Sequence, residues 1–167
     1  MVKMDKNKQD DLSGGAGDAD MIRAALLNKD VALANKLLAH PYTLCGIVTH
    51  GKALGRRSNM PTANLQLQPD KFIPAHGVYA TVTKIDDISY LGVTHIGPRP
   101  TVDDSTEVTV ETYMPDFSGD IYGRYIETEL HFYLRETKKF NNLDEVKAQV
   151  DLDIKIARKL LADHILI

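Results

Sequence analysis

The chain has 167 residues, the usual size of one domain, with room for a hydrophobic core and little room for a second domain. Hydrophobic residues make up 43% and charged residues 26%, a composition that excludes wholesale disorder. A formal net charge of -3 argues against a general nucleic-acid binder, and a single cysteine, Cys45, excludes an internal disulfide and a Cys-rich zinc site. No run of about 18 apolar residues occurs, so we expect no membrane span and a cytoplasmic protein.

The N-terminal part of the chain divides into two segments. Residues 1–19 are polar and contain glycine, which predicts a disordered arm. Residues 20–41 carry apolar side chains at helical spacing and predict a short helical hairpin. Asp18 or Asp20 is available as the N-cap of its first helix, and Asp30 as that of the second.

After this hairpin, residues 42–167 are predicted to form the main domain, in which β-branched and aromatic residues become dense and the pattern alternates. The six predicted strands are residues 43–49, 63–67, 77–85, 89–96, 107–114 and 124–135. Asp86 and Asp87 predict a tight hairpin between the third and fourth strands. Because no helices separate these strands, we expect an antiparallel sheet that closes as a barrel.

The last predicted element is a helix with one apolar face. Its apolar residues recur at steps of three and four: Leu143, Val146, Val150, Ile154, Ala157 and Leu161. Asn142 and Glu145 have the spacing of a capping box at its start. We therefore expect one face of this C-terminal helix to be buried against the barrel.

The stretch from residue 50 to residue 65 has a composition suited to phosphate. Its glycines and cations are Gly51, Lys52, Gly55, Arg56 and Arg57. Thr62 and Asn64 follow two residues apart on an extended segment, so their side-chain oxygens point to one side, as magnesium ligands do. A solvated basic hairpin loop explains the same composition equally well.

The strand at residues 107–114 carries a second candidate, Glu111. Strand alternation places Glu111 on the face opposite Val108 and Val110. A carboxylate held rigidly beside a cleft suits a general base, whereas an exposed strand glutamate that pairs with a lysine has the same spacing. The spacing alone favours the second interpretation.

Four further candidate residues have structural alternatives. Arg99 lies in the proline-rich segment 96–101, which we interpret as a stiff turn between strands. Phe117 and Tyr122 either stack on a planar ligand ring or plug the end of the barrel. Arg135 ends the last strand, where a surface ion pair is the simpler explanation. The six histidines lack the spacing of a zinc site.

Several motifs follow one another in the order of a known family. They are GKALGRRSNMPTANLQ from residue 51, GVYA from 77, GPRPT from 97, VETYMPDFSGDIYG from 110 and LRETKKF from 134. Over about residues 42–161 the chain resembles riboflavin kinase, and in particular the C-terminal kinase module of the bacterial bifunctional riboflavin kinase/FAD synthetase.

The resemblance implies a six-stranded antiparallel Greek-key barrel that phosphorylates the 5′-hydroxyl of riboflavin with ATP, giving FMN and ADP. By motif, Glu111 matches the catalytic base, and Thr62 and Asn64 match the residues that hold Mg²⁺ and the nucleotide phosphates. The residues expected around the nucleotide are Gly51, Lys52, Gly55, Arg56, Phe117 and Tyr122. Arg135 falls on the flavin side.

The rest of the comparison concerns what the chain lacks or changes. Residues 20–41 resemble the segment that joins the two modules of the bifunctional enzyme, whose nucleotidyltransferase module is absent here, so we expect no FAD synthesis. Asn59 and Met60 replace the glycine and aromatic residue usual before the PTAN motif. The alternative functions are a flavin- or FMN-binding regulatory protein with little turnover and a barrel that binds a protein partner. We expect small-molecule substrates and a monomer.

Overall fold

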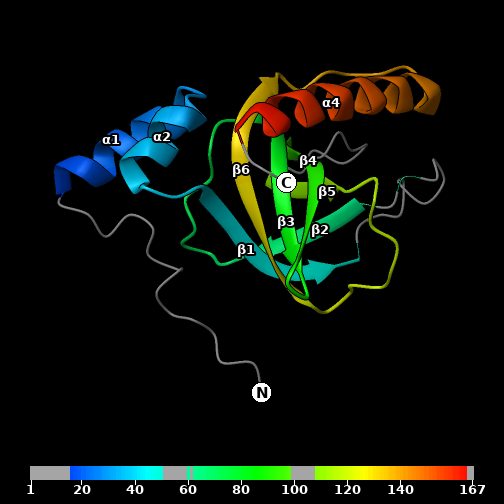
Figure 1. The fold of residues 1–167 in the computed structure, drawn as a ribbon, viewed down its shortest axis with the longest axis horizontal. Coiled ribbons are helices and arrows are strands. Elements are labelled where there is room, and N and C mark those ends of the chain that lie inside the picture. Colours follow the sequence, from blue (N-terminus) through cyan, green and yellow to red (C-terminus); the bar gives the residue numbers. More distant parts are fainter. Residues whose placement is uncertain (1–15, 51–59, 61, 99–107, 165–167) are drawn as a thin grey trace.

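The computed structural model describes residues 16–50, 60, 62–98 and 108–164, and its described strands close into one antiparallel barrel (Figure 1). The strands are β1 (Tyr42–Thr49), β2 (Thr62–Leu67), β3 (Gly77–Ile85), β4 (Ile88–Pro98), β5 (Val108–Tyr113) and β6 (Tyr125–Arg135). Their order around the barrel is β1-β2-β5-β4-β3-β6. Strands β3, β4 and β5 are sequential neighbours, and β2 lies beside β5, which is a Greek-key arrangement. The predicted fold class is confirmed.

The strand boundaries agree with the sequence-based expectation to within two residues. The predicted hairpin at Asp86 and Asp87 is also confirmed, and both residues have positive φ, 50° and 64°, as a tight turn between twisted strands requires. One boundary was wrong, because β4 continues through Gly97 and Pro98, which we had assigned to a turn. Arg99 lies outside the described residues.

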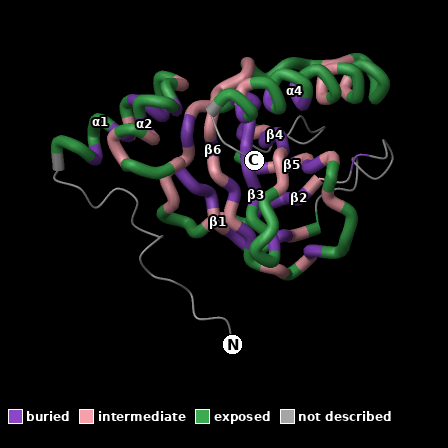
Figure 2. The backbone as a smooth tube through the Cα atoms, viewed as in Figure 1, coloured by how far each residue is buried: buried purple, intermediate pink, exposed green. Residues whose placement is uncertain are grey.

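The barrel interior combines aliphatic side chains with hydrogen-bonded threonines. The hydroxyl of Thr94 lies 3.0 Å from that of Thr81 and 2.8 Å from that of Thr112, and the hydroxyls of Thr83 and Thr128 are 3.0 Å apart. These five threonines are completely buried, so each hydroxyl finds a partner inside the barrel. Figure 2 shows the buried positions along the strands.

Helix α4 (Leu143–His164) packs on the outside of the barrel, across β3, β4 and β6 (Figures 1 and 2). Its residues Ile154, Ala157 and Leu161 form a second hydrophobic cluster with outward-facing residues of the sheet, as the sequence predicted. The Asn142 side chain accepts a hydrogen bond from the Glu145 N–H at 2.9 Å, while the Glu145 carboxylate accepts one from the N–H of Asn141. No helix in the described part of the chain is long and apolar enough to cross a bilayer.

The N-terminal hairpin consists of α1 (Ala16–Leu27) and α2 (Val31–Leu38). The Asp30 side chain accepts from the N–H of Leu33, as predicted for an N-cap. The predicted caps of the first helix, Asp18 and Asp20, were wrong, since both lie inside α1. The helix therefore includes residues 16–19, which we had assigned to the arm, and the remainder of that arm lies outside the described residues.

The hairpin is part of the same hydrophobic core as the barrel. Its buried residues Ile22, Leu26 and Val31 belong to the cluster that fills the barrel interior. Polar contacts reinforce the junction, because the Asn35 amide donates to the backbone carbonyl of Leu130 at 2.9 Å and its oxygen accepts from the N–H of Tyr42 at 2.8 Å. The helices are thereby fixed against β1 and β6.

Candidate active site

Three polar residues form a row across the outer face of the barrel. In the strand register Asn64 of β2 lies opposite Glu111 of β5, and Glu111 lies opposite His95 of β4. Residues directly opposite in antiparallel strands project to the same face. The flanking residues of β5, Val110 and Thr112, are buried in the barrel, so Glu111 and its two neighbours face outward. We call Asn64, Glu111 and His95 the polar row.

The polar row is partly shielded from solvent. Asn64 is only 6% exposed, and Glu111 and His95 are half-buried. Thr62, also half-buried, shares the outer face of β2 with Asn64 because the two residues are two positions apart. In the described residues no three His, Cys, Asp or Glu side chains gather as a metal site. A cation bound at the polar row would therefore be coordinated by oxygens such as those of Thr62 and Asn64, together with oxygens of a bound ligand.

His95 connects the polar row to the segment after β6. Its Nε2 lies 3.4 Å from the hydroxyl of Thr137. A Cβ built on Gly97 would lie 3.2 Å from the same nitrogen, so the glycine leaves space for the ring. Burial, with smaller contributions from the charges of Arg135 and His76, lowers the pKa of His95 below its usual value. The lowered pKa favours the neutral form of the imidazole.

Arg135 is fixed by a buried carboxylate on α4. Its Nε and Nη2 donate to Asp153 at 3.0 and 2.8 Å, and its Nη1 donates to the carbonyl of Glu136 at 3.0 Å. Asp153 is 1% exposed and also accepts from the Gln149 amide at 3.0 Å. Because a charge buried so fully needs compensation, this bidentate pair anchors the end of β6 to α4.

Strand β6 pairs irregularly with β3 in the residues just before Arg135. Along β3 and β6 the register shifts twice, between Val78 and Tyr79 and between Ala80 and Thr81. An extra residue in one strand reverses the face to which the following residues point. The two shifts cancel at Arg135, which lies opposite Val78 on the outer face that simple alternation from the inward-facing Leu130 also gives. Phe132, which lies between the two shifts, has its face reversed, and it packs in the outer cluster under α4.

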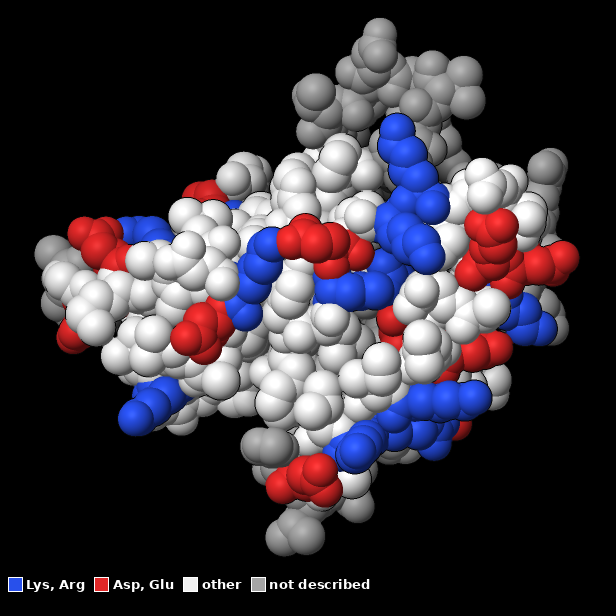
Figure 3. Space-filling view, turned by 90° about the horizontal axis from the view of Figure 1, so that it is seen from above, with Lys and Arg blue, Asp and Glu red and all other residues white. Residues whose placement is uncertain are grey.

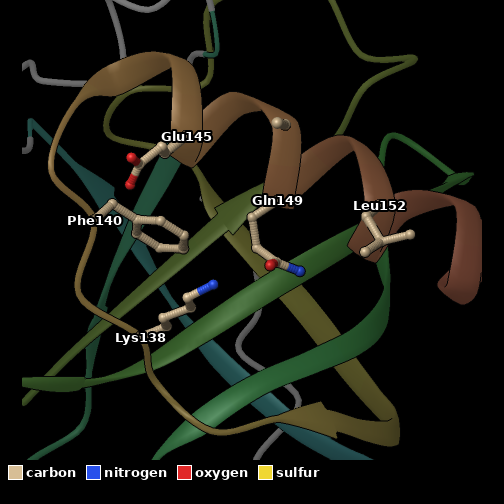
Figure 4. A pocket seen from close by; sticks show the side chains of 6 residues that line it. Lys138, Phe140, Glu145, Gln149 and Leu152 are labelled. Carbon is tan, nitrogen blue, oxygen red and sulfur yellow. The ribbon is translucent and has the colours of Figure 1, made fainter.

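An open hollow lies between the segment after β6 and the first turns of α4 (Figure 4). It has a volume of about 320 Å³ and is lined by Lys138, Phe140, Glu145, Ala148, Gln149 and Leu152. The Phe140 ring has Arg135 Cζ at 5.9 Å and Lys138 Nζ at 5.6 Å from its centre. The hollow thus offers an aromatic ring, an exposed Leu152 and polar groups at its edge. The hollow is an open surface depression rather than an enclosed cavity.

The charges on the side of the molecule that carries α4 are mixed. Figure 3, which views the molecule from above, shows lysine and arginine side chains interspersed with aspartate and glutamate. Exposed ion pairs in the described residues include Arg158 with Asp116 and Lys29 with Glu136. In this view the visible described surface is therefore not one continuous basic face of the kind that attracts a nucleic-acid backbone.

Comparison with known families gives a clear match. The family model for riboflavin kinase, named Flavokinase, matches residues 38–161, which include the whole barrel and nearly all of α4. The chain belongs to the riboflavin kinase family. The polar row, Arg135 and the hollow all fall within the matched residues.

Curated relatives of this riboflavin kinase family member are named bifunctional riboflavin kinase/FMN adenylyltransferase. The protein from Pseudomonas fluorescens is 38% identical over 152 residues, which cover 91% of this chain and 49% of the relative. The Bacillus subtilis protein is 36% identical, over 89% of this chain and 52% of the relative. The Escherichia coli K12 protein is 40% identical, over 83% of this chain and 44% of the relative. The chain spans about half the length of the curated relatives it matches.

Solved structures share the fold of this riboflavin kinase family member. The crystal structure of a macrolide-efflux protein from Streptococcus pneumoniae matches with a TM-score of 0.76 at 34% identity, covering 83% of this chain and 45% of that one. Riboflavin kinase from Trypanosoma brucei matches with a TM-score of 0.51 at 24% identity, covering 73% and 80%. The second likeness shows a shared fold.

The structure brings together some of the predicted site residues. Thr62, Asn64 and Glu111 share one outer face, as the interpretation of a common site requires. Arg135 does more than the expected surface ion pair, since its partner Asp153 is buried. The expected nucleotide-loop residues Gly51, Lys52, Gly55 and Arg56, and also Asn59, lie outside the described residues.

The two predicted aromatic residues lie at one end of the barrel. Tyr122 stacks on His50 with ring centres 3.8 Å apart, and Phe117 meets the edge of Tyr90 at 5.1 Å. Both are partly buried against the barrel core, which agrees with the alternative that they plug its end. A nucleotide contact for Phe117 and Tyr122 stays a prediction.

Sequence reasoning missed His95 and Asp153. His95 joins the site through the pairing of β4 with β5, which no local pattern specifies. Asp153 gave a detectable signal, because it occupies the apolar stripe of α4 next to Ile154, where a carboxylate needs a buried partner. That partner, Arg135, is 18 residues away in sequence.

Proposed function

We propose that this chain transfers the γ-phosphoryl group of ATP to the terminal ribityl hydroxyl of riboflavin, giving FMN and ADP. The observation that carries the proposal is the pairing of Asn64 with Glu111 on one face of a riboflavin kinase barrel. This face is connected through His95 and Thr137 to a hollow of about 320 Å³. These contacts support a site in which Asn64 would meet the phosphates, Glu111 the reacting hydroxyl and the hollow the flavin ring.

Glu111 is the proposed general base. The ribityl oxygen attacks the γ-phosphorus, the bond from that phosphorus to the β–γ bridging oxygen breaks, and the hydroxyl proton passes to the Glu111 carboxylate. A residue in the middle of β5, paired on both sides, holds its carboxylate in a fixed place. Fixed placement contributes to such a reaction by orienting the attacking oxygen.

Thr62 and Asn64 are the proposed residues for Mg²⁺. Their hydroxyl and amide oxygens are the hard donors this ion prefers, and a site with few protein ligands is usual for Mg²⁺ held with substrate phosphates. Their location on one outer face, next to the Glu111 carboxylate, fits that donor set. When bound, the ion would neutralise charge on the transferring phosphoryl group.

The nucleotide is proposed to lie on the side of the row where β2 begins. Gly51, Lys52, Gly55 and Arg56 precede Thr62 in the sequence, and backbone N–H groups and cations of this kind bind phosphate. Tyr122 stacks on His50, the residue before Gly51, and with Phe117 would border the nucleotide.

The flavin ring is proposed to occupy the hollow beside α4. Phe140 and Leu152 would contact the ring, and Lys138 and Gln149 would bind its polar edge. Arg135 serves this side by fixing the segment that carries Lys138 and Phe140, and its guanidinium lies near the Phe140 ring.

Other parts of the assignment are also proposals. Residues 20–41 would correspond to the linker before the kinase module, and the chain itself would not convert FMN into FAD. A cytoplasmic monomer is in keeping with the small-molecule substrates. The competing function, a flavin-binding regulator with little turnover, would have no use for a carboxylate next to the Mg²⁺ ligands.

The test is to incubate the purified chain with riboflavin, ATP and Mg²⁺ and to follow the flavins by chromatography. We expect FMN to form with ADP in equal amounts and no FAD to appear. Riboflavin binding without FMN at any protein concentration would instead support the regulator and refute the kinase assignment.

A further inference from the structure

His95 lies beside the proposed base and contacts the segment that lines the proposed flavin hollow. It is opposite Glu111 on β4, and its ring reaches Thr137, the residue before Lys138 of the hollow. Neighbouring strands are about 4.8 Å apart, so the polar row from Asn64 to His95 spans about 10 Å. Glu111, His95, Thr137 and Lys138 are thus successive neighbours from the proposed base to the edge of the hollow.

The two side chains have the chemistry to bind hydroxyl groups. A neutral imidazole has one donor and one acceptor nitrogen, and a threonine hydroxyl both donates and accepts. The separation of 3.4 Å between His95 Nε2 and Thr137 Oγ1 makes their mutual hydrogen bond a long one, so a ligand hydroxyl could replace it at little cost. Thr137 is exposed, and Gly97 leaves open the space beside the His95 ring.

We propose that His95 and Thr137 form the subsite that binds the ribityl hydroxyls of the flavin, and so make the site selective for flavins with a polyol chain. This inference rests on the proposed kinase function, because it needs the ring in the hollow and the terminal hydroxyl at Glu111. His95 acts here by touching the substrate, and Arg135 and Asp153 act through the segment that carries Thr137.

The alternative is that His95 only packs between β4 and the segment after β6. A packing residue would affect all flavins alike when it is removed. A ribityl subsite would affect only flavins that carry the ribityl chain. Lumiflavin, which has a methyl group in place of that chain, separates the two cases.

The experiment measures the Kd of riboflavin and of lumiflavin by quenching of flavin fluorescence. The proteins compared are the wild type, His95→Ala, His95→Asn and Thr137→Val, with His40→Ala as the matched control. His40 is an exposed histidine that contacts the carbonyl of Pro41, outside the site. Thr137→Val changes an exposed side chain of the same shape, so the test does not depend on the stability of a His95 variant.

For His95→Ala and Thr137→Val we expect the Kd of riboflavin to rise about three- to tenfold, as the loss of one neutral hydrogen bond implies, with that of lumiflavin unchanged. His95→Asn should recover part of the loss, and His40→Ala should match the wild type. In turnover the KM for riboflavin should rise while the KM for ATP stays constant. Equal weakening of both flavins, or no change in either, would overturn the subsite.

The outcome for the subsite can be distinguished from that for the kinase. If the wild type forms no FMN, the proposed function fails first, and the subsite fails with it. If the wild type forms FMN while the ratio of the two Kd values is the same in all variants, only the subsite is wrong.

Discussion

Asn64 of β2 and Glu111 of β5 lie directly opposite each other on the outer face of the barrel. The two residues are 47 positions apart in the chain, yet adjacent strands bring a nearly buried amide next to a half-buried carboxylate. This relationship gives the proposed kinase site its two halves, one for Mg²⁺ and phosphate and one for the reacting hydroxyl. A change at Asn64 should therefore affect the Mg²⁺ requirement, whereas a change at Glu111 should affect the rate of FMN formation.

Replacing Asn64 should weaken the use of Mg²⁺. In Asn64→Ala the amide oxygen is lost, so we expect the Mg²⁺ concentration for half-maximal FMN formation to rise several-fold, corresponding to about 1 kcal/mol or more. The matched control is Gln66→Ala, an exposed residue two positions along the same face of β2. An unchanged Mg²⁺ requirement in Asn64→Ala, with a normally folded protein, would remove Asn64 from the proposed metal site.

Breaking the pair of Arg135 with Asp153 should destabilise the fold. In Arg135→Met the buried carboxylate of Asp153 loses its ion pair and keeps the hydrogen bond from the Gln149 amide. We expect the free energy of unfolding in urea to fall by about 3 kcal/mol, because the buried charge is no longer compensated by a cation. Arg158→Met is the control, because its pair with Asp116 is exposed, and it should change stability by less than about 1 kcal/mol.

A second substitution identifies the cause. Adding Asp153→Asn to Arg135→Met removes the uncompensated charge and should restore part of the lost stability. If Arg135→Met is as stable as the wild type, Arg135 does not compensate Asp153 and the anchoring of β6 to α4 must have another source.

Glu129 should contribute stability that depends on pH. His131 Nε2 at 3.4 Å, and Lys84 Nζ at 2.5 Å, lower the pKa of Glu129 from 4.5 to about 2 in the folded protein. Its contribution is therefore complete above about pH 4.5 and is lost as the pH falls toward 2. Glu129→Gln should lower the free energy of unfolding by about 1 kcal/mol at pH 7.

The check is the difference in stability between wild type and Glu129→Gln, measured by urea unfolding at pH 7, 4 and 3. The difference should narrow as the pH falls, since the wild-type carboxylate becomes protonated. A difference that is constant over this range would show that the charge of Glu129 is not what stabilises the fold.

Much of the fold could be predicted because local patterns specify it. Alternation and turn residues gave the six strands, and the apolar stripe with the cap at Asn142 gave α4. The start of α1 could not be located in this way. Gly17 and Asp18 are poor helix formers, and the buried Ala19 that holds this turn against the core is a weak apolar signal.

The candidate site could be predicted only in part, because it combines motif residues with residues placed by register. Glu111 and Asn64 belong to recognisable motifs, whereas the position of His95 opposite Glu111 follows from the pairing of β4 with β5. The outward face of Phe132 depends on a register shift in β6, which simple alternation misses. Which residues of distant strands lie opposite each other depends on how the whole barrel closes, so a local sequence pattern does not specify it.

The most direct test of the account compares Glu111→Gln with the wild type in two measurements on the same preparation. FMN formation should fall by a factor of about 10² or more, because proton transfer contributes that much, while the Kd of riboflavin stays within about twofold. Glu127→Gln, a strand glutamate on β6, should retain wild-type turnover. Turnover by Glu111→Gln at the wild-type rate would contradict the assignment of Glu111 as the base of the proposed kinase reaction.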